Sequence, residues 1–118
     1  MKYLLSIYER EGDWAAMSEP EQQAGFAEYM ALSDELAAAG KLLAAEPLQP
    51  VATASIVRVR EGKTLVTDGP YAETREQLGG FYLIEVESLD EALAVAARIP
   101  GSRHGTIEVR PVMPVPGR

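Results

Sequence analysis

The sequence predicts an α+β domain of the ferredoxin-like class, with an antiparallel sheet, two helices on one face and an added β-hairpin. Three observations lead to this prediction. Two strong helix-start signals divide the chain, short apolar runs with period-two alternation lie between them, and no internal repeat is present. The length of 118 residues with 47% hydrophobic content suits one compact domain. Strands joined by two crossover helices fit a two-layer sandwich of this kind.

The first strand is expected over Lys2–Tyr8, where apolar side chains occupy both faces. Glu9–Asp13 reads as a charged loop, and Trp14 is expected to pack over the end of the core rather than to stack on a ligand. The segment Ser18-Glu19-Pro20-Glu21 is a capping box with proline in the first turn, so a helix should run from there to about Ala39. Its expected inner face comprises Phe26, Tyr29, Met30, Ser33, Leu36 and Ala37.

Short strands are expected to follow this helix. Lys41–Ala45 is one, and Ala52–Arg60 is a longer one that turns at Glu61-Gly62-Lys63 and returns over Thr64–Thr67 as a hairpin. The next strand is expected over Phe81–Val86.

A second capping signal at Ser88-Leu89-Asp90-Glu91 begins another helix, which ends at Pro100-Gly101. Its apolar stripe comprises Leu89, Ala92, Leu93, Ala96 and Ile99. The last strand is expected over Gly105–Val112, so the domain spans residues 1–112, with 113–118 as an extended proline-rich tail.

A single helix layer leaves the other face of the sheet uncovered. The residues expected on that face are Ile56, Arg58, Phe81, Leu83, Glu85, Glu108 and Arg110. A patch of this size is unusual in a monomer, so we expect a second copy to pack sheet to sheet and form a homodimer with a barrel-like interior.

Composition excludes several classes of function. The formal net charge of −7 opposes nucleic-acid binding, and no apolar run approaches the length of a membrane span. With no cysteine and no secretory signal, we expect a cytoplasmic protein. Glycine-rich nucleotide motifs are missing and His104 is the one histidine, so no cofactor or metal site is expected. A solvent-exposed loop position is the default interpretation of His104, and a general base is the alternative.

The segment Val66–Phe81 carries the densest set of candidate site residues. Asp68-Gly69-Pro70 is typical of a turn, because Asp can hydrogen-bond the turn amides, Gly is conformationally free and Pro fixes the backbone that follows. Gly79-Gly80 would let a ligand or another chain approach closely. Asp68 and Glu73 are the candidate catalytic carboxylates, Asp68 also fixing the turn. The candidate ligand-binding residues are Arg75, Tyr71, Tyr29, Arg58 and Arg110. The alternatives are a charged surface hairpin and, for most arginines, internal ion pairs.

This segment, read from Val66 as VTDGPYAETREQLGGF, together with Ile84-Glu85-Val86 and Ile107-Glu108-Val109-Arg110-Pro111, closely resembles the YCII-related proteins of the DGPF subgroup. Tyr71 stands where the subgroup has phenylalanine. The resemblance implies a bacterial protein with a dimeric α+β barrel.

The wider YCII-like group is associated with a proposed catalytic histidine on the first helix and an aspartate before a proline. These positions fall at about Tyr29 and at Ile99, so neither residue is present. The resemblance also implies an association with extracytoplasmic-function sigma factors, because DGPF relatives look like partners of those proteins.

Two functions are consistent with these residues. One is a homodimer that binds a small polar or anionic ligand in its barrel cavity, with or without enzymatic turnover. The other is a non-catalytic regulatory or interaction module that contacts a sigma factor or another transcription protein.

Overall fold

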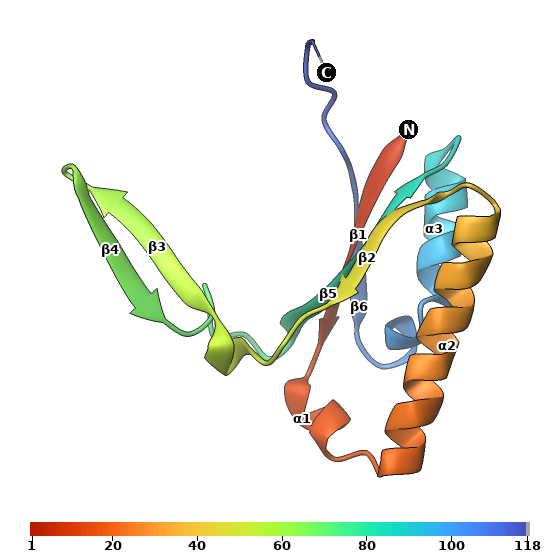
Figure 1. Cartoon of the computed structure of the whole chain (residues 1–118), viewed down its shortest axis with the longest axis horizontal. Coiled ribbons are helices and arrows are strands. Elements are labelled where there is room, and N and C mark those ends of the chain that lie inside the picture. The colour runs from red at the N-terminus through yellow and green to blue at the C-terminus, as the bar shows by residue number, and fades with distance from the viewer. Residues whose placement is uncertain (118) are drawn as a thin grey trace.

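The computed structural model describes residues 1–117, which form a four-stranded antiparallel sheet, a helical layer and a separate two-stranded hairpin (Figure 1). Arg118, the end of the predicted tail, lies outside the described residues. The strand order is β2-β5-β1-β6, and both long helices cover the same face. This is the predicted ferredoxin-like arrangement. The main strands are β1 (Lys2–Glu9), β2 (Leu42–Pro47), β5 (Gln77–Glu85) and β6 (Thr106–Pro111).

Two long helices, α2 (Glu19–Ala38) and α3 (Leu89–Arg98), begin at the predicted caps. The Ser18 Oγ accepts a hydrogen bond from the Glu21 amide (3.3 Å), while the Ser18 amide donates to Glu21 Oε1 (3.0 Å). Ser88 Oγ accepts from the Glu91 amide (3.2 Å). Each cap satisfies backbone donors that the first helical turn leaves free. No helix within residues 1–117 combines the length and apolarity that a membrane crossing requires.

The core lies between the helices and one face of the two central strands. Its buried apolar residues are Tyr3, Leu5, Ile7, Leu32, Leu36, Tyr82, Ile84, Val86, Ala92, Val95, Ala96 and Ile99. The strand predicted over Lys2–Tyr8 is therefore confirmed, and Tyr3, Leu5 and Ile7 are its residues that face the helices.

The predicted inner face of α2 is partly wrong, because Phe26 and Met30 are 53% and 60% exposed while Leu32 is buried. The inward face instead follows Tyr29, Leu32 and Leu36 at spacings of three and four residues, and Phe26 and Met30 lie on an adjacent face.

The stripe of α3 needs a similar correction. Ala92, Ala96 and Ile99 are buried as predicted, but Leu93 is 46% exposed and Leu89 48%. Val95 takes a buried place instead. In both helices, apolar residues occupy two neighbouring faces, so the sequence pattern alone did not distinguish the buried face from the exposed one.

Two local predictions are also corrected. Part of the expected charged loop is a short helix, α1 (Glu11–Ala15), and β5 begins at Gln77, so the two glycines lie inside a strand. A Cβ on Gly80 would lie 3.0 Å from the Glu46 carbonyl oxygen of β2. The chain that approaches Gly80 is therefore the neighbouring strand, and this glycine serves sheet packing.

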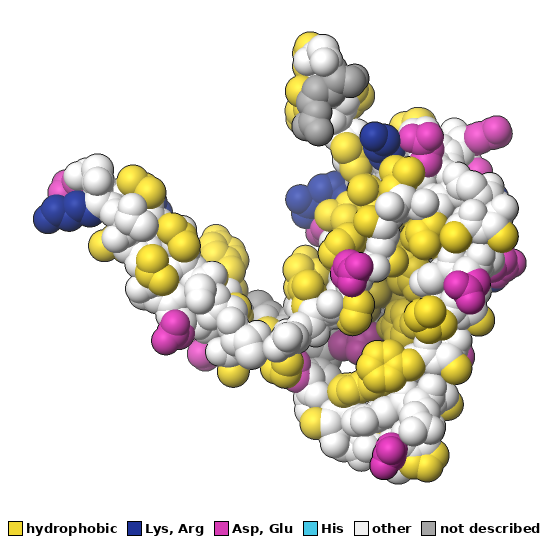
Figure 2. Space-filling model, in the orientation of Figure 1, with side chains coloured by type: hydrophobic (Ala, Val, Ile, Leu, Met, Phe, Trp, Pro, Cys, Tyr) yellow, Lys and Arg dark blue, Asp and Glu magenta, His cyan; other side chains and the backbone are white. Residues whose placement is uncertain are grey.

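The hairpin of β3 (Ser55–Arg60) and β4 (Lys63–Asp68) forms its own two-stranded sheet and projects from the body (Figure 1). The sequence placed Ile56 and Arg58 on the uncovered face of the main sheet. That prediction is wrong, because both residues lie on the separate hairpin. Hydrophobic side chains are exposed along the hairpin (Figure 2), among them Val57, Val59, Leu65 and Val66. Because of this projection the radius of gyration is 16.3 Å, whereas about 13.5 Å is typical of a compact domain of this length.

The face of the sheet opposite the helices carries Leu4, Ser6 and Tyr8 from β1, with Phe81 and Leu83 from β5. Ser6 is buried, and the four larger residues are partly exposed. No helix within residues 1–117 covers this face (Figure 1). It is an apolar surface bordered by the Glu108–Arg110 ion pair (2.7 Å).

We predict that Leu5→Ala lowers the free energy of unfolding by about 2 to 5 kcal/mol, because the fully buried side chain leaves a cavity between β1 and the helices. Leu93→Ala, which removes the same atoms from a position 46% exposed on α3, is the matched control and should change stability by about 0.5 kcal/mol or less. Urea unfolding measures both. Equal losses for the two variants would contradict the assignment of the core.

Candidate functional site

The polar segment after β4 folds as a tight turn followed by an irregular loop. Gly69 has φ of +102°, which favours glycine, and its amide donates to the Ala54 carbonyl (2.8 Å), closing the base of the hairpin. The Gln77 side-chain amide donates to the carbonyls of Ala72 and Thr74, each at 3.1 Å. The loop is thus held by its own polar groups where it meets the main sheet.

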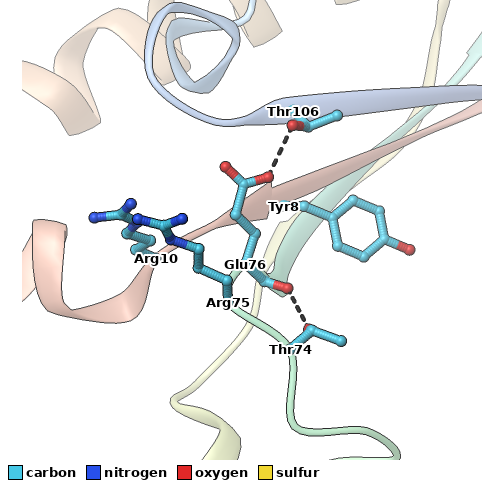
Figure 3. A pocket seen from close by; sticks show the side chains of 6 residues that line it. All are labelled: Tyr8, Arg10, Thr74, Arg75, Glu76 and Thr106. Carbon is cyan, nitrogen blue, oxygen red and sulfur yellow. Dashed lines mark hydrogen bonds between the residues drawn. The ribbon is translucent and has the colours of Figure 1, made fainter.

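This loop forms one wall of an open hollow of about 540 Å³ at the end of β1. The lining residues are Tyr8, Arg10, Thr74, Arg75, Glu76 and Thr106 (Figure 3). Tyr8 and Thr106 are opposite each other in the β1–β6 ladder, on the uncovered face of the sheet. We call this the arginine hollow.

Two guanidinium groups, those of Arg10 and Arg75, line the arginine hollow (Figure 3), and within residues 1–117 neither is within 4.0 Å of a carboxylate. The nearby carboxylate of Glu76 instead accepts a hydrogen bond from the Thr106 hydroxyl (2.8 Å). Two guanidinium groups that line one hollow are suited to hold the oxygens of an anion.

The structure brings only one of the predicted site residues, Arg75, into this hollow. Glu73 and the 82% exposed Tyr71 lie on the same loop but do not line it. Asp68 ends β4, and Arg58 is exposed on β3, so both belong to the hairpin. The roles of these four residues stay predictions.

Ion pairs were predicted for most of Arg58, Arg60, Arg75 and Arg110, and this prediction is wrong within residues 1–117, where Arg110 pairs with Glu108 at 2.7 Å and the other three are unpaired. Arg10 was missed by the sequence reasoning, because a cation directly after a strand gives no signal of where its side chain lies.

A second cavity, of about 300 Å³, lies between α1, α2 and the 3₁₀ turn η2 (Pro100–Arg103). Tyr29, the remaining predicted residue, lines it. Its hydroxyl donates to Glu9 Oε1 (3.1 Å) and accepts from the Gly101 amide (3.1 Å). The second Glu9 oxygen, Oε2, lies 3.9 Å from His104 Nε2. We call this the tyrosine cavity.

Burial raises the pKa of Tyr29, and the neighbouring Glu9 carboxylate raises it further by charge repulsion and by accepting a hydrogen bond from the protonated phenol. Tyr29 therefore remains protonated and donates to Glu9 across the neutral range. The contact also requires Gly101, since a Cβ there would lie 2.2 Å from Glu9 Oε1 and 2.9 Å from the Tyr29 hydroxyl.

Trp14 lines the tyrosine cavity rather than covering the core. Its ring meets Phe26 edge to face, with centroids 4.9 Å apart, and it approaches Gly25 of α2. This is the one tryptophan of the chain, so its fluorescence reports on this cavity.

Comparison with known proteins places these features in a family. Residues 1–116 match the YCII-related domain. The chain belongs to this family. An uncharacterized protein, R00369, from Rhizobium meliloti (strain 1021) is 40% identical over 114 residues, which cover 95% of this chain and 92% of that protein.

A solved structure with a similar fold is 5-chloro-2-hydroxyhydroquinone dehydrochlorinase (TftG) from Burkholderia phenoliruptrix AC1100, in complex with 2,5-dihydroxybenzoquinone. The TM-score is 0.57 at 16% identity, with 96% of this chain and 94% of that chain covered. The likeness confirms the α+β fold.

The positions that the resemblance implies for the histidine and aspartate of the YCII-like group fall at about Tyr29 and at Ile99. Tyr29 lines the tyrosine cavity, and Ile99 is fully buried in the core.

We predict that Tyr29→Phe lowers the free energy of unfolding by about 1 to 2 kcal/mol at neutral pH, because Glu9 and Gly101 lose their shared partner. The folded-state pKa of Tyr29 is raised above its ordinary 10.0, so this contribution is complete below pH 10 and falls as the pH rises above it. The difference between wild type and variant should therefore shrink at a pH of about 11.

Urea unfolding at both pH values tests this. Tyr71→Phe is the matched control, because that side chain is 82% exposed, and it should match wild type at both pH values. A difference between wild type and Tyr29→Phe that is constant with pH would contradict the prediction.

Proposed function

We propose that this YCII protein is a homodimer of the DGPF subgroup that binds a small polar or anionic molecule in the arginine hollow. The observation behind this proposal is the pair of guanidinium groups, Arg10 and Arg75, that share one hollow without a carboxylate partner among residues 1–117. In a chain of net charge −7, two arginines that line one hollow without a carboxylate partner among residues 1–117 depart from the usual pattern of surface ion pairs. Each guanidinium offers a fork of donors to a carboxylate or phosphate.

The position of the hollow connects ligand binding to dimerisation. Tyr8 and Thr106 belong to the uncovered face of the sheet, the same face that presents Leu4, Phe81 and Leu83. A second copy packed on that face would lie beside the hollow and exclude water from it. Exclusion of water strengthens each ionic hydrogen bond in the hollow.

The hairpin supports the same dimer. An isolated two-stranded hairpin is marginally stable in water, and here both strands are largely exposed. The hairpin projects away from the main sheet and helices, and its apolar side chains are exposed (Figure 2). A partner subunit could bury these side chains.

The structural neighbour supports a small-molecule role, because that protein holds 2,5-dihydroxybenzoquinone, a small oxygen-rich ring. A role for Asp68 and Glu73 in transferring a proton to or from a bound ligand stays a prediction.

We predict that Arg10→Ala and Arg75→Ala each weaken binding of an anionic ligand at least about tenfold, because each removes a charged donor pair. Thermal shift against a panel of small carboxylates and phosphates finds the ligand, and calorimetry measures its Kd. Arg98→Ala is the control, because that arginine pairs with Glu35 outside the hollow. Ligand-induced stabilisation that survives both hollow variants would overturn the site.

We predict that Leu83→Glu converts the dimer to a folded monomer, since it places a charge at the centre of the uncovered face. Leu93→Glu adds the same charge to the outer surface of α3, where the leucine is 46% exposed, and should leave the mass unchanged. Light scattering at micromolar protein measures the mass, and circular dichroism confirms folding. A wild-type monomer, or an unchanged dimer in Leu83→Glu, would reject this interface.

A further inference from the structure

We infer that the ligand of the arginine hollow is an acidic amino acid, of the glutamate or aspartate class. Arg10 and Arg75 bind its two carboxylates, and Glu76 binds its ammonium group. The inference rests on the proposed function, because it names the ligand class of the same hollow. The observation that carries it is that two cations and one carboxylate line one hollow and do not pair with each other.

Glu76 is fixed in the wall of the hollow by two threonine hydroxyls. The Thr106 hydroxyl, at the start of β6, donates to Glu76 Oε1 at 2.8 Å, and the Thr74 hydroxyl donates to the Glu76 main-chain carbonyl at 2.5 Å (Figure 3). The Glu76 side chain is half-buried, whereas Arg75 is exposed. A carboxylate that is already held in place loses little conformational freedom when a ligand binds to it.

The second oxygen of this carboxylate is left for a ligand. Oε1 is bonded to Thr106, but Oε2 has no hydrogen-bond or ion-pair partner among residues 1–117. An ionised carboxylate is an acceptor with room for several hydrogen bonds. Oε2 can therefore accept from an ammonium group while Oε1 keeps its bond to Thr106.

The threonines leave the binding of an anion to the arginines. A hydroxyl has one proton to donate, and both Thr74 and Thr106 donate theirs to Glu76. Toward a ligand their oxygens are therefore acceptors, which suits an ammonium group and not a carboxylate. Each guanidinium, in contrast, has only donors, in a fork that matches a carboxylate.

Charge selects among the small molecules that could enter the hollow. Its lining carries two positive groups and one negative group, and an acidic amino acid at neutral pH carries the reverse set. A dicarboxylate without an amine would place an anion beside Glu76, and like charges repel. A neutral amino acid such as glutamine would leave one guanidinium without a carboxylate.

The size and wall of the hollow also suit such a ligand. Its volume of about 540 Å³ lies within the range for small-molecule pockets. The half-buried ring of Tyr8 is an apolar part of the lining, against which the methylene groups of the ligand can pack.

Calorimetry on the full-length protein tests the ligand class with three probes. L-Glutamate has the full set of charges, glutarate lacks the ammonium group, and L-glutamine lacks the second carboxylate. L-Glutamate should bind at least about threefold more tightly than either of the others, because each of them leaves one charged group of the hollow without a partner. This comparison uses the wild-type protein alone.

The variant Glu76→Gln separates the ammonium contact from the binding of the carboxylates. The amide can still accept from Thr106 but has no charge, so L-glutamate should bind at least about threefold more weakly. Glutarate should bind equally well or more tightly, because the repelling charge is gone. Glu87→Gln is the matched control, since this exposed glutamate follows the opposite end of β5, and it should change neither affinity. Circular dichroism shows that both variants are folded.

Failure of this inference differs from failure of the proposed function. The ligand class is overturned if glutarate binds as tightly as L-glutamate, if Glu76→Gln weakens both equally, or if neither L-glutamate nor L-aspartate binds at millimolar concentration. In those cases the hollow still binds anions if Arg10→Ala and Arg75→Ala weaken glutarate or another carboxylate or phosphate. Both proposals fail if all such binding survives the two arginine variants.

Discussion

The burial of alternate residues on the two central strands is the constraint on which the rest of this structure depends. Tyr3, Leu5 and Ile7 of β1 meet the helices, and Tyr82 and Ile84 do the same from β5. Since strand side chains alternate, this commits every intervening residue to the opposite face. That face has no helix within residues 1–117, so the larger side chains there stay partly exposed.

The same alternation distributes the two sites at the end of β1. Tyr8 points to the uncovered side and lines the arginine hollow, and Arg10 joins it there after the strand ends. Glu9, between them, faces the opposite side and lines the tyrosine cavity. Three consecutive residues therefore line two different cavities, and a shift of one residue in register would exchange the faces to which they point.

The sequence was sufficient for the elements that local signals define. Capping boxes at Ser18 and Ser88 predicted both helix starts, because those hydrogen bonds lie within one turn. It was insufficient where a contact joins distant residues. Tyr29 could be named as a candidate, but its link to Glu9 and Gly101 spans 20 and 72 positions, and no spacing rule encodes it. Arg10 likewise lines the same hollow as Arg75 only because the loop before β5 returns to the end of β1.

The loop between α3 and β6 packs against the end of β1, where the arginine hollow and the tyrosine cavity meet. A Cβ on Gly105 would lie 2.3 Å from the Tyr8 carbonyl oxygen, and one on Gly101 would lie 2.2 Å from Glu9 Oε1. Both glycines let this loop press against the end of β1 where a larger residue would collide with backbone or with a hydrogen-bonded carboxylate. The loop thereby fixes Glu9 toward His104 and starts β6, whose Thr106 holds Glu76 in the arginine hollow. The arginine hollow and the tyrosine cavity therefore share one strand end and the loop packed against it.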